Sequence, residues 1–184
     1  MKKLLVTALM VLAPAMAQAQ EATSDTSSKS FQVIGRVPTL CSAGTLTGDG
    51  NFDLGVLIDL STGLLRNDLS APSKALTGAF CSARSTIAIT ATPLTAQNYT
   101  ATPPAGFSRQ VNYVATASGW TTTPASFNTA AATNAAASQT RDSAFTGDIT
   151  VGIGSYATAG GNSLRLVGDM DYRGVVTVTL SAAQ

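Results

Sequence analysis

Near its end the chain reads Tyr172-Arg173-Gly174-Val175-Val176-Thr177-Val178-Thr179-Leu180. Every second position of this stretch holds an apolar residue or glycine, namely Tyr172, Gly174, Val176, Val178 and Leu180. An alternation with a period of two places the apolar side chains on one face of a β-strand, and branched Val and Thr side chains suit a pleated surface. The stretch therefore predicts a strand with one face in the core and the other face, with Thr177 and Thr179, in water.

Five other stretches show the same alternation of apolar and polar residues. They are residues 31–37, 51–60, 87–91, 110–115 and 148–153. No window shows the longer period of an amphipathic helix with capping residues. Six or more strands, each with one wet face, fit an antiparallel arrangement. We therefore predict a single all-β domain built as an antiparallel β-sandwich.

The first residues have the composition of a secretory signal peptide. Met1-Lys2-Lys3 is a short basic start, residues 4–16 are mainly apolar, and Ala17-Gln18-Ala19 has the small residues that signal peptidase recognises. We predict cleavage after Ala19 and export through the inner membrane to the periplasm, the cell surface or the medium. The apolar run is shorter than the roughly 20 residues of a membrane span. No other segment approaches that length, so we expect no membrane span after cleavage.

Two further segments differ in composition from the predicted strands. Residues 20–30 are polar and rich in Ser and Thr, which predicts a flexible N-terminal segment. Residues 121–140 consist mainly of Thr, Ala, Asn and Ser, which predicts a long exposed loop. The expected organisation is a signal peptide at 1–19, a flexible segment at 20–30 and one β-sandwich domain at 31–184.

The charges argue against several classes of function. The 184 residues include 11 Lys and Arg, 10 Asp and Glu and no His, so the chain lacks the clustered basic charge that binds nucleic acid. Without His it also lacks the commonest general base and metal ligand, and no Ser–His–Asp set can form. We predict a protein that is not an enzyme and takes no cofactor or metal. Its polar surface is expected to consist mainly of its 26 Thr and 18 Ser.

Two short motifs resemble known binding loops but differ at decisive positions. Residues 49–53 begin like a calcium loop, yet Leu54 and Leu60 occupy the positions of the required Gly and Glu. Residues 152–157 match a dinucleotide fingerprint, yet a turn-forming sequence follows them where that fold needs a helix. We interpret both as turns or strand ends without a ligand.

Cys41 and Cys81 are the only cysteines, so only one intramolecular pairing exists. In an oxidising compartment we expect them to form a disulfide. Closing a loop of this length stabilises a fold by roughly 4 kcal/mol on a chain-entropy argument. Two thiols without His or a CxxC spacing cannot build a zinc site.

Several features occur in an order that resembles a known class of secreted subunits. The order is a strand at 31–37, Cys41, the element Phe52-Asp53-Leu54-Gly55, Cys81 at the head of a strand, residues 109–113 followed by Gly119-Trp120, and the closing strand at 172–180. Together they resemble the spore coat protein U type of domain and, more broadly, the chaperone–usher pilin subunits.

The resemblance implies an incomplete immunoglobulin-like sandwich, in which a missing strand leaves an apolar groove. In these families a strand from a periplasmic chaperone, and then one from the next subunit, fills the groove. Backbone hydrogen bonds give the affinity and alternate side chains fill pockets. The implied function is that of a structural subunit of a surface or pilus-like assembly, with a chaperone, an usher and like subunits as partners.

The residues before the first predicted strand depart from this family pattern. A donor extension alternates apolar residues, whereas residues 20–30 contain only Ala22 as an apolar side chain. Either the stretch 31–37 is itself the donor, or the chain accepts a strand without donating one, as a tip subunit or a monomeric relative would. The residues expected in strand exchange or in the terminal strand are Phe31, Val33, Val37, Tyr172, Val176, Val178 and Leu180.

An alternative function is a self-complete β-sandwich that binds carbohydrate or another surface ligand. Tyr113 and Trp120 are the aromatic residues that would form a stacking platform for such a ligand. A Trp buried in the core is the competing interpretation.

Overall fold

The computed structural model describes residues 26–183. The chain divides into a unit that ends at Arg36 and a unit that begins at Val37. The described residues of the first unit form no helix or strand. The signal peptide predicted at 1–19 and residues 20–25 of the predicted N-terminal segment lie outside the described residues.

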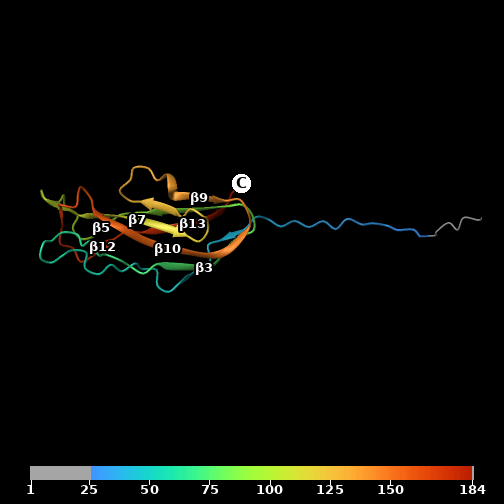
Figure 1. Ribbon diagram of the computed structural model, residues 1–184, viewed down its shortest axis with the longest axis horizontal. Coiled ribbons are helices and arrows are strands. Elements are labelled where there is room, and N and C mark those ends of the chain that lie inside the picture. Colours follow the sequence, from blue (N-terminus) through green and yellow to red (C-terminus); the bar gives the residue numbers. More distant parts are fainter. Residues whose placement is uncertain (1–25, 184) are drawn as a thin grey trace, which may run out of the picture. The chain divides into compact units, whose positions relative to one another are not determined.

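The secondary structure of the unit from Val37 consists of strands and one 3-10 turn of helix (Figure 1). The strands are β1 (Cys41–Ser42), β2 (Thr45–Thr47), β3 (Lys74–Cys81), β4 (Ser85–Ala91), β5 (Leu94–Ala96), β6 (Phe107–Ser108), β7 (Gln110–Ser118), β8 (Ala125–Asn128), β9 (Ser138–Arg141), β10 (Phe145–Thr158), β11 (Arg165–Leu166), β12 (Tyr172–Arg173) and β13 (Val176–Ala182), and the helix is η1 (Ala135–Ala137). No helix in this part of the chain is long and apolar enough to cross a membrane.

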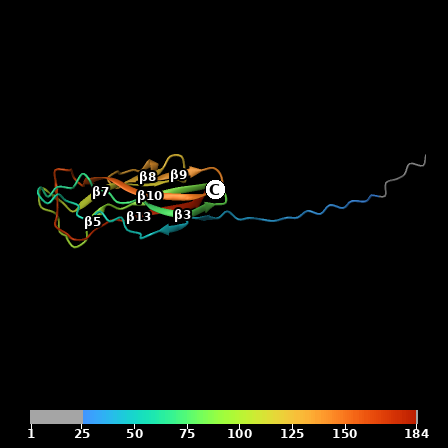
Figure 2. The same ribbon diagram turned by 60° about the horizontal axis from the view of Figure 1, so that its bottom comes forward.

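Two antiparallel sheets form a β-sandwich. The larger sheet has the order β1-β3-β10-β7-β5-β12, with β2 on β3 and β8 on β7, and the smaller has the order β13-β4-β9. Figure 2 shows β3, β10 and β7 lying next to one another. The order β1-β3-β10-β7 matches strands A, B, E and D of an immunoglobulin domain, and β4 pairs with β13 as strand C pairs with strand F. The predicted all-β, immunoglobulin-like antiparallel sandwich is confirmed. A short parallel pair, β6 with β11, lies outside the two sheets.

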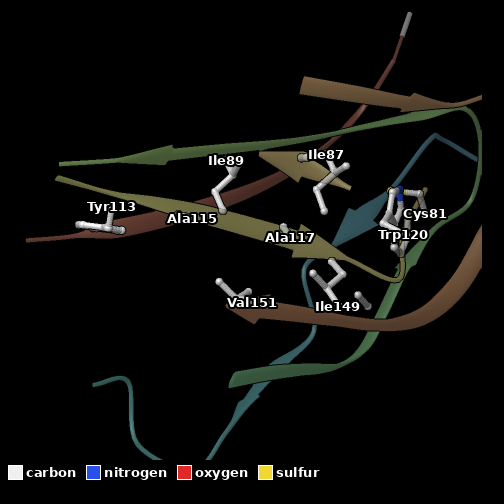
Figure 3. Packing of buried hydrophobic residues seen from close by; sticks show 11 residues of the cluster. Cys81, Ile87, Ile89, Tyr113, Ala115, Ala117, Trp120, Ile149 and Val151 are labelled. Carbon is white, nitrogen blue, oxygen red and sulfur yellow. The ribbon is translucent and has the colours of Figure 1, made fainter. Parts of the chain in front are cut away.

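The core lies between the two sheets. Figure 3 shows Ile87 and Ile89 pointing from β4 toward β7 and β10, where Ile149 and Val151 point back. In β4 and β7, and at Ile149 and Val151 of β10, the buried residues are two positions apart, as the period-two alternation predicts. Burying one such side chain contributes about 1.5–3 kcal/mol.

The predicted disulfide is present between Cys41 and Cys81. It joins β1 to the last residue of β3, and the two cysteines face each other in the register of these strands. Cys81 belongs to the buried core cluster, beside Trp120 in Figure 3. The bond therefore ties the first strand of the sandwich to its centre.

Three of the predicted strands are confirmed, because β4 contains residues 87–91, β7 contains 110–115 and β10 contains 148–153. The closing stretch is confirmed only in part, because it divides after Arg173 into β12 in the larger sheet and β13 in the smaller. The predicted faces of β13 are also correct. Its apolar residues at even positions are partly buried, whereas Thr177 and Thr179 are exposed.

The strand predicted at residues 31–37 is wrong as a strand of this domain. The segment forms no strand, and Phe31, Val33 and Val37 are 88%, 99% and 88% exposed. Alternation shows only that a stretch suits a β-strand. A strand also needs a neighbouring edge for its N–H and C=O groups, and within the described part of the chain this segment pairs with none.

The strand predicted at residues 51–60 is also wrong, because it contributes only an isolated bridge from Ile58 to Leu65. The chain turns at Asp59, whose carboxylate accepts hydrogen bonds from the backbone N–H of Ser61 at 2.7 Å and of Thr62 at 3.2 Å. An Asp that bonds to the backbone two residues ahead stabilises a turn. The carboxylate thus fixes a turn at the end of the stretch, and residues 51–57 before the turn form no strand.

The loop predicted at residues 121–140 contains β8, η1 and most of β9 instead. Two asparagines hold this part of the chain. The backbone N–H of Asn128 donates to Oδ1 of Asn134 at 2.6 Å, and Nδ2 of Asn134 donates to the carbonyl of Asn128 at 3.2 Å. Side-chain amides here take the place of backbone partners, so a tract of low complexity becomes ordered.

Candidate functional site

The last strand, β13, pairs with a neighbour on one side only. It runs antiparallel to β4 from Val176 to Ala182, and within residues 26–183 no strand pairs with its opposite edge. We call this opposite edge the outer edge of β13. In an immunoglobulin domain strand G lies beside strand F at this position. The backbone groups along the outer edge are therefore free to bond an added strand.

The inward side chains of β13 are incompletely covered. Val176, Val178 and Leu180 pack against the buried core cluster, yet each is only partly buried. β1 also contacts β13, so an added strand would lie near the first strand of the larger sheet. Apolar side chains that are half covered gain further burial when a strand is added beside them.

The start of β13 has a fixed backbone position. A Cβ atom at Gly174 would lie 2.6 Å from the carbonyl oxygen of Thr92, so no larger residue fits there without a shift. The close approach to Thr92 explains why the alternation has a glycine at position 174. Gly174 contributes no side chain to the core. Before it, the hydroxyl of Tyr172 donates to the carbonyl of Val167 at 2.9 Å. Burial raises the pKa of Tyr172 to about 12.

An apolar groove lies along the chain just before β13. It has a volume of about 520 Å³ and we call it the end groove. Its lining consists of residues 52–58, Leu60 and residues 166–172. Leu60 is 86% exposed and Met170 is fully exposed. Large apolar side chains gathered in this way on a surface mark an interaction site more often than single exposed ones do.

Asp169 holds one wall of the end groove in place. Its carboxylate accepts hydrogen bonds from the backbone N–H of Asn98 at 2.7 Å and of Tyr99 at 2.8 Å, and from Nδ2 of Asn98 at 2.9 Å. The side chain of Asn98, together with these backbone donors, holds the pKa of Asp169 well below its usual range. The carboxylate therefore joins the segment before β13 to the segment after β5.

At the opposite end of the domain, hydrogen bonds hold the backbone of Leu40 in place. The backbone N–H of Leu40 donates to Oγ of Ser82 at 2.9 Å, and the N–H of Ser82 donates to the carbonyl of Leu40 at 2.9 Å. At the same end the N–H of Ala183 donates to the carbonyl of Arg84 at 2.9 Å. The start of β1 and the end of β13 therefore both attach to the turn between β3 and β4.

The predicted stacking platform of Tyr113 and Trp120 is wrong. Trp120 is 0% and Tyr113 is 2% exposed, so neither ring can contact a surface ligand. The indole N–H of Trp120 donates to Oγ of Ser85 at 3.1 Å. The indole ring packs edge-on against the ring of Phe145, with 5.1 Å between the two ring centroids. The competing interpretation, a core Trp, is the one that the structure bears out.

The described residues contain no group of three or more His, Cys, Asp or Glu that could hold a metal ion. Asp49, at the start of the calcium-like motif, forms an ion pair with Lys74. Lys74 lowers the pKa of this exposed carboxyl. Asp49 thus has a partner within the chain.

The sequence identified one part of this site and missed the other. Val176, Val178 and Leu180 were predicted from alternation, and the structure places them at the unpaired edge. The end groove was missed because its two walls are about a hundred residues apart in the chain. The only local signal is the concentration of Val, Leu and Ile in residues 54–60. Comparison of the chain with known protein families, with curated proteins and with solved structures finds no match.

Proposed function

We propose that the chain is a secreted, non-enzymatic structural subunit of a surface or pilus-like assembly, whose members join by β-strand complementation at the outer edge of β13. The observation that carries the proposal is that β13 pairs on one side only within the described part of the chain. At the outer edge an added strand finds unpaired backbone groups together with partly buried apolar side chains. Binding by strand addition uses these two features, the first for affinity and the second for specificity.

Residues 31–37 are well suited to supply the added strand. Phe31, Val33, Gly35 and Val37 would share one face of a strand, and the three large side chains are exposed. Burying each of these side chains would contribute about 1.5–3 kcal/mol. This supports the alternative in which the chain donates its own segment over the one in which it only accepts a strand.

The outer edge of β13 also accounts for the partners that the resemblance implies. An unpaired strand edge is a template for aggregation, so a newly exported subunit needs a cover for it. We propose that a periplasmic chaperone covers the edge first, that an usher directs assembly, and that a like subunit then takes the place of the chaperone. This route requires export, for which residues 1–19 are the expected signal.

A carbohydrate-binding function has less support. It needs an exposed aromatic platform, and Tyr113 and Trp120 are buried in the core. Strand complementation needs only the edge of β13 and a segment with alternating apolar residues.

The two faces of residues 31–37 provide the test. Val33→Asp puts a charge on the face that complementation would bury, and Ile34→Asp puts the same charge on the opposite face. We expect Val33→Asp to weaken self-association of the mature chain, measured by analytical ultracentrifugation, by about 30-fold, the equivalent of about 2 kcal/mol. Ile34→Asp should change it by less than about threefold.

A second measurement separates a lost contact from a damaged fold. A peptide of residues 29–39 added to the Val33→Asp variant should raise its Tm, because the peptide binds the folded state only. Equal association by the Val33→Asp and Ile34→Asp variants, with no effect of the peptide on Tm, would contradict the proposal.

A further inference from the structure

Exposed apolar side chains are concentrated in one short part of the chain. Four of them lie within the seven residues 31–37: Phe31, Val33 and Val37 are almost fully exposed, and Ile34 is 79% exposed. No other described stretch of this length contains as many large apolar residues in contact with water. Since these residues form no strand or helix, the described chain leaves this apolar surface uncovered.

Two basic residues, Lys29 and Arg36, lie among these apolar residues. Neither forms an ion pair with another described residue. We call residues 29–37 the amphiphilic segment. It contains no acidic residue, so its net charge is +2.

The other basic residues of the described chain already have partners. Arg66, Lys74, Arg84 and Arg173 form ion pairs, and Arg109, Arg141 and Arg165 donate to backbone carbonyls. The amphiphilic segment therefore combines a cluster of exposed apolar side chains with basic side chains that the rest of the described chain does not use.

This combination is suited to the surface of an anionic bilayer. Binding there increases with the apolar area that enters the boundary between headgroups and acyl chains, and with the attraction of Lys and Arg to anionic lipids. Lys and Arg can place their alkyl stems against the apolar layer while their charged ends stay at the phosphates. A helix that crosses a bilayer needs about 20 apolar residues, so a segment of this length suits the surface of the bilayer.

We propose that the amphiphilic segment of the unassembled chain binds the surface of an anionic phospholipid bilayer. Phe31, Val33 and Val37 enter the boundary of the acyl chains, and Lys29 and Arg36 contact the phosphates. The inference goes beyond the proposed function and does not depend on it, because it requires neither the outer edge of β13 nor a second copy.

Ile34 distinguishes a bilayer from a strand edge as the cover of this segment. In a strand, Phe31, Val33 and Val37 share one face and Ile34 lies on the other. A groove on a β-sandwich covers one face of an added strand and leaves Ile34 in water. A bilayer surface is fluid and surrounds a side chain from several directions, so it also removes Ile34 from water.

Binding to a bilayer and donation to a neighbour exclude each other, because both cover Phe31, Val33 and Val37. A copy whose segment lies on the bilayer cannot donate it, and pairing with a neighbour releases the segment from the lipid. For an exported subunit the bilayer would then hold the donor segment covered until assembly. This consequence, unlike the membrane contact itself, rests on the proposed function.

Flotation of the mature full chain with lipid vesicles tests the proposal. Vesicles of phosphatidylcholine and phosphatidylglycerol in equal parts provide the anionic surface, and vesicles of phosphatidylcholine alone are neutral. We expect binding to the anionic vesicles to be about 25-fold tighter, because each of two basic residues near such a surface contributes about fivefold. Equal binding to the two kinds of vesicle overturns the proposal.

Ile34→Ser removes an apolar side chain without changing the charge. We expect it to weaken binding to the anionic vesicles by about tenfold, whereas Phe107→Ser, at an exposed residue of β6, leaves binding unchanged. Ile34→Ser should self-associate like the unmodified chain, because strand complementation leaves Ile34 in water. A variant Ile34→Ser that binds vesicles as tightly as the unmodified chain refutes the insertion of apolar side chains and with it the proposal.

Lys29→Ser with Arg36→Ser removes the two positive charges of the segment. We expect about 25-fold weaker binding to the anionic vesicles and no change with the neutral ones. Arg66→Ser with Arg173→Ser is the matched control, because it changes the net charge equally at residues that already form ion pairs. This control should change binding by less than about threefold. Equal losses in the two double variants would show attraction by net charge alone and would overturn the proposal.

The outcomes separate this proposal from the function proposed above. Vesicle binding by a chain that stays monomeric at all concentrations supports the membrane contact and refutes strand complementation. If the chain floats with neither kind of vesicle but self-associates in a way that Val33→Asp weakens, strand complementation stands and the membrane contact is wrong.

Discussion

Thr92 and Val175 are joined by two hydrogen bonds of 2.9 Å, one in each direction. The N–H of Thr92 donates to the carbonyl of Val175, and the N–H of Val175 donates to Oγ1 of Thr92. The pair lies where the chain leaves β12 in the larger sheet and enters β13 in the smaller. Because Gly174 stands against Thr92 at the same point, this crossing fixes where the outer edge of β13 begins.

Replacing Thr92 by Val removes the hydroxyl acceptor at this crossing and keeps the shape of the side chain. We expect a loss of about 1 kcal/mol in the free energy of unfolding, as for a typical hydrogen bond, measured by urea denaturation. Thr90→Val is the matched control, because Thr90 is exposed on β4. Equal losses in the two variants would show that the bond to Val175 has no special role.

Replacing Ser85 by Ala leaves the indole N–H of Trp120 without its partner in the core. Both residues are fully buried, so water cannot replace the hydroxyl. An unsatisfied buried donor costs about 1–3 kcal/mol, and we expect a loss of that size in the free energy of unfolding. Ser138→Ala, at an exposed position of β9, is the control and should change stability by less than about 0.5 kcal/mol. A Ser85→Ala variant as stable as the control would contradict the assigned bond.

Asp169 should make the stability of the fold depend on acid pH. Its pKa is lower in the folded protein than the ordinary value of 3.8. The stabilisation by its hydrogen bonds is therefore complete above that value and is lost as the pH falls toward the folded pKa. In Asp169→Asn, which does not titrate, the decline in stability below pH 4 should be shallower. Chemical denaturation at a series of pH values from 2 to 7 measures this slope, and Asp53→Asn serves as the control. An unchanged slope in Asp169→Asn would refute the role of this carboxylate.

The alternation of apolar and polar residues correctly predicted strands that bury one face in the core. β4, β7 and β13 have buried or partly buried residues at every second position, because both the pleat and the residue pattern have a period of two. Residues 31–37 have the same pattern and form no strand in this domain. The pattern indicates which face a strand would bury, but it does not indicate the neighbouring strand or surface that would cover this face.

The candidate site was predictable to the same extent. Val176 and Val178 were expected on the inner face of the last strand, which is a property of nine consecutive residues. That β13 has no second neighbour among residues 26–183 depends on the order of the sheets, which the alternation of residues does not specify. Likewise, the partner of the buried Trp120 indole N–H is Ser85, which is 35 positions away in the chain.

The sequence by itself determined the strand faces, the pairing of Cys41 with Cys81 and the absence of His chemistry, because these follow from residue identity and from a local period. The tertiary structure alone decided the open edge of β13 and the end groove. Residues 52–58, Leu60 and residues 166–172 form that groove only after loop closure brings distant parts of the chain together. Contacts of this kind depend on the packing of the whole sandwich, and no short stretch of the chain encodes them.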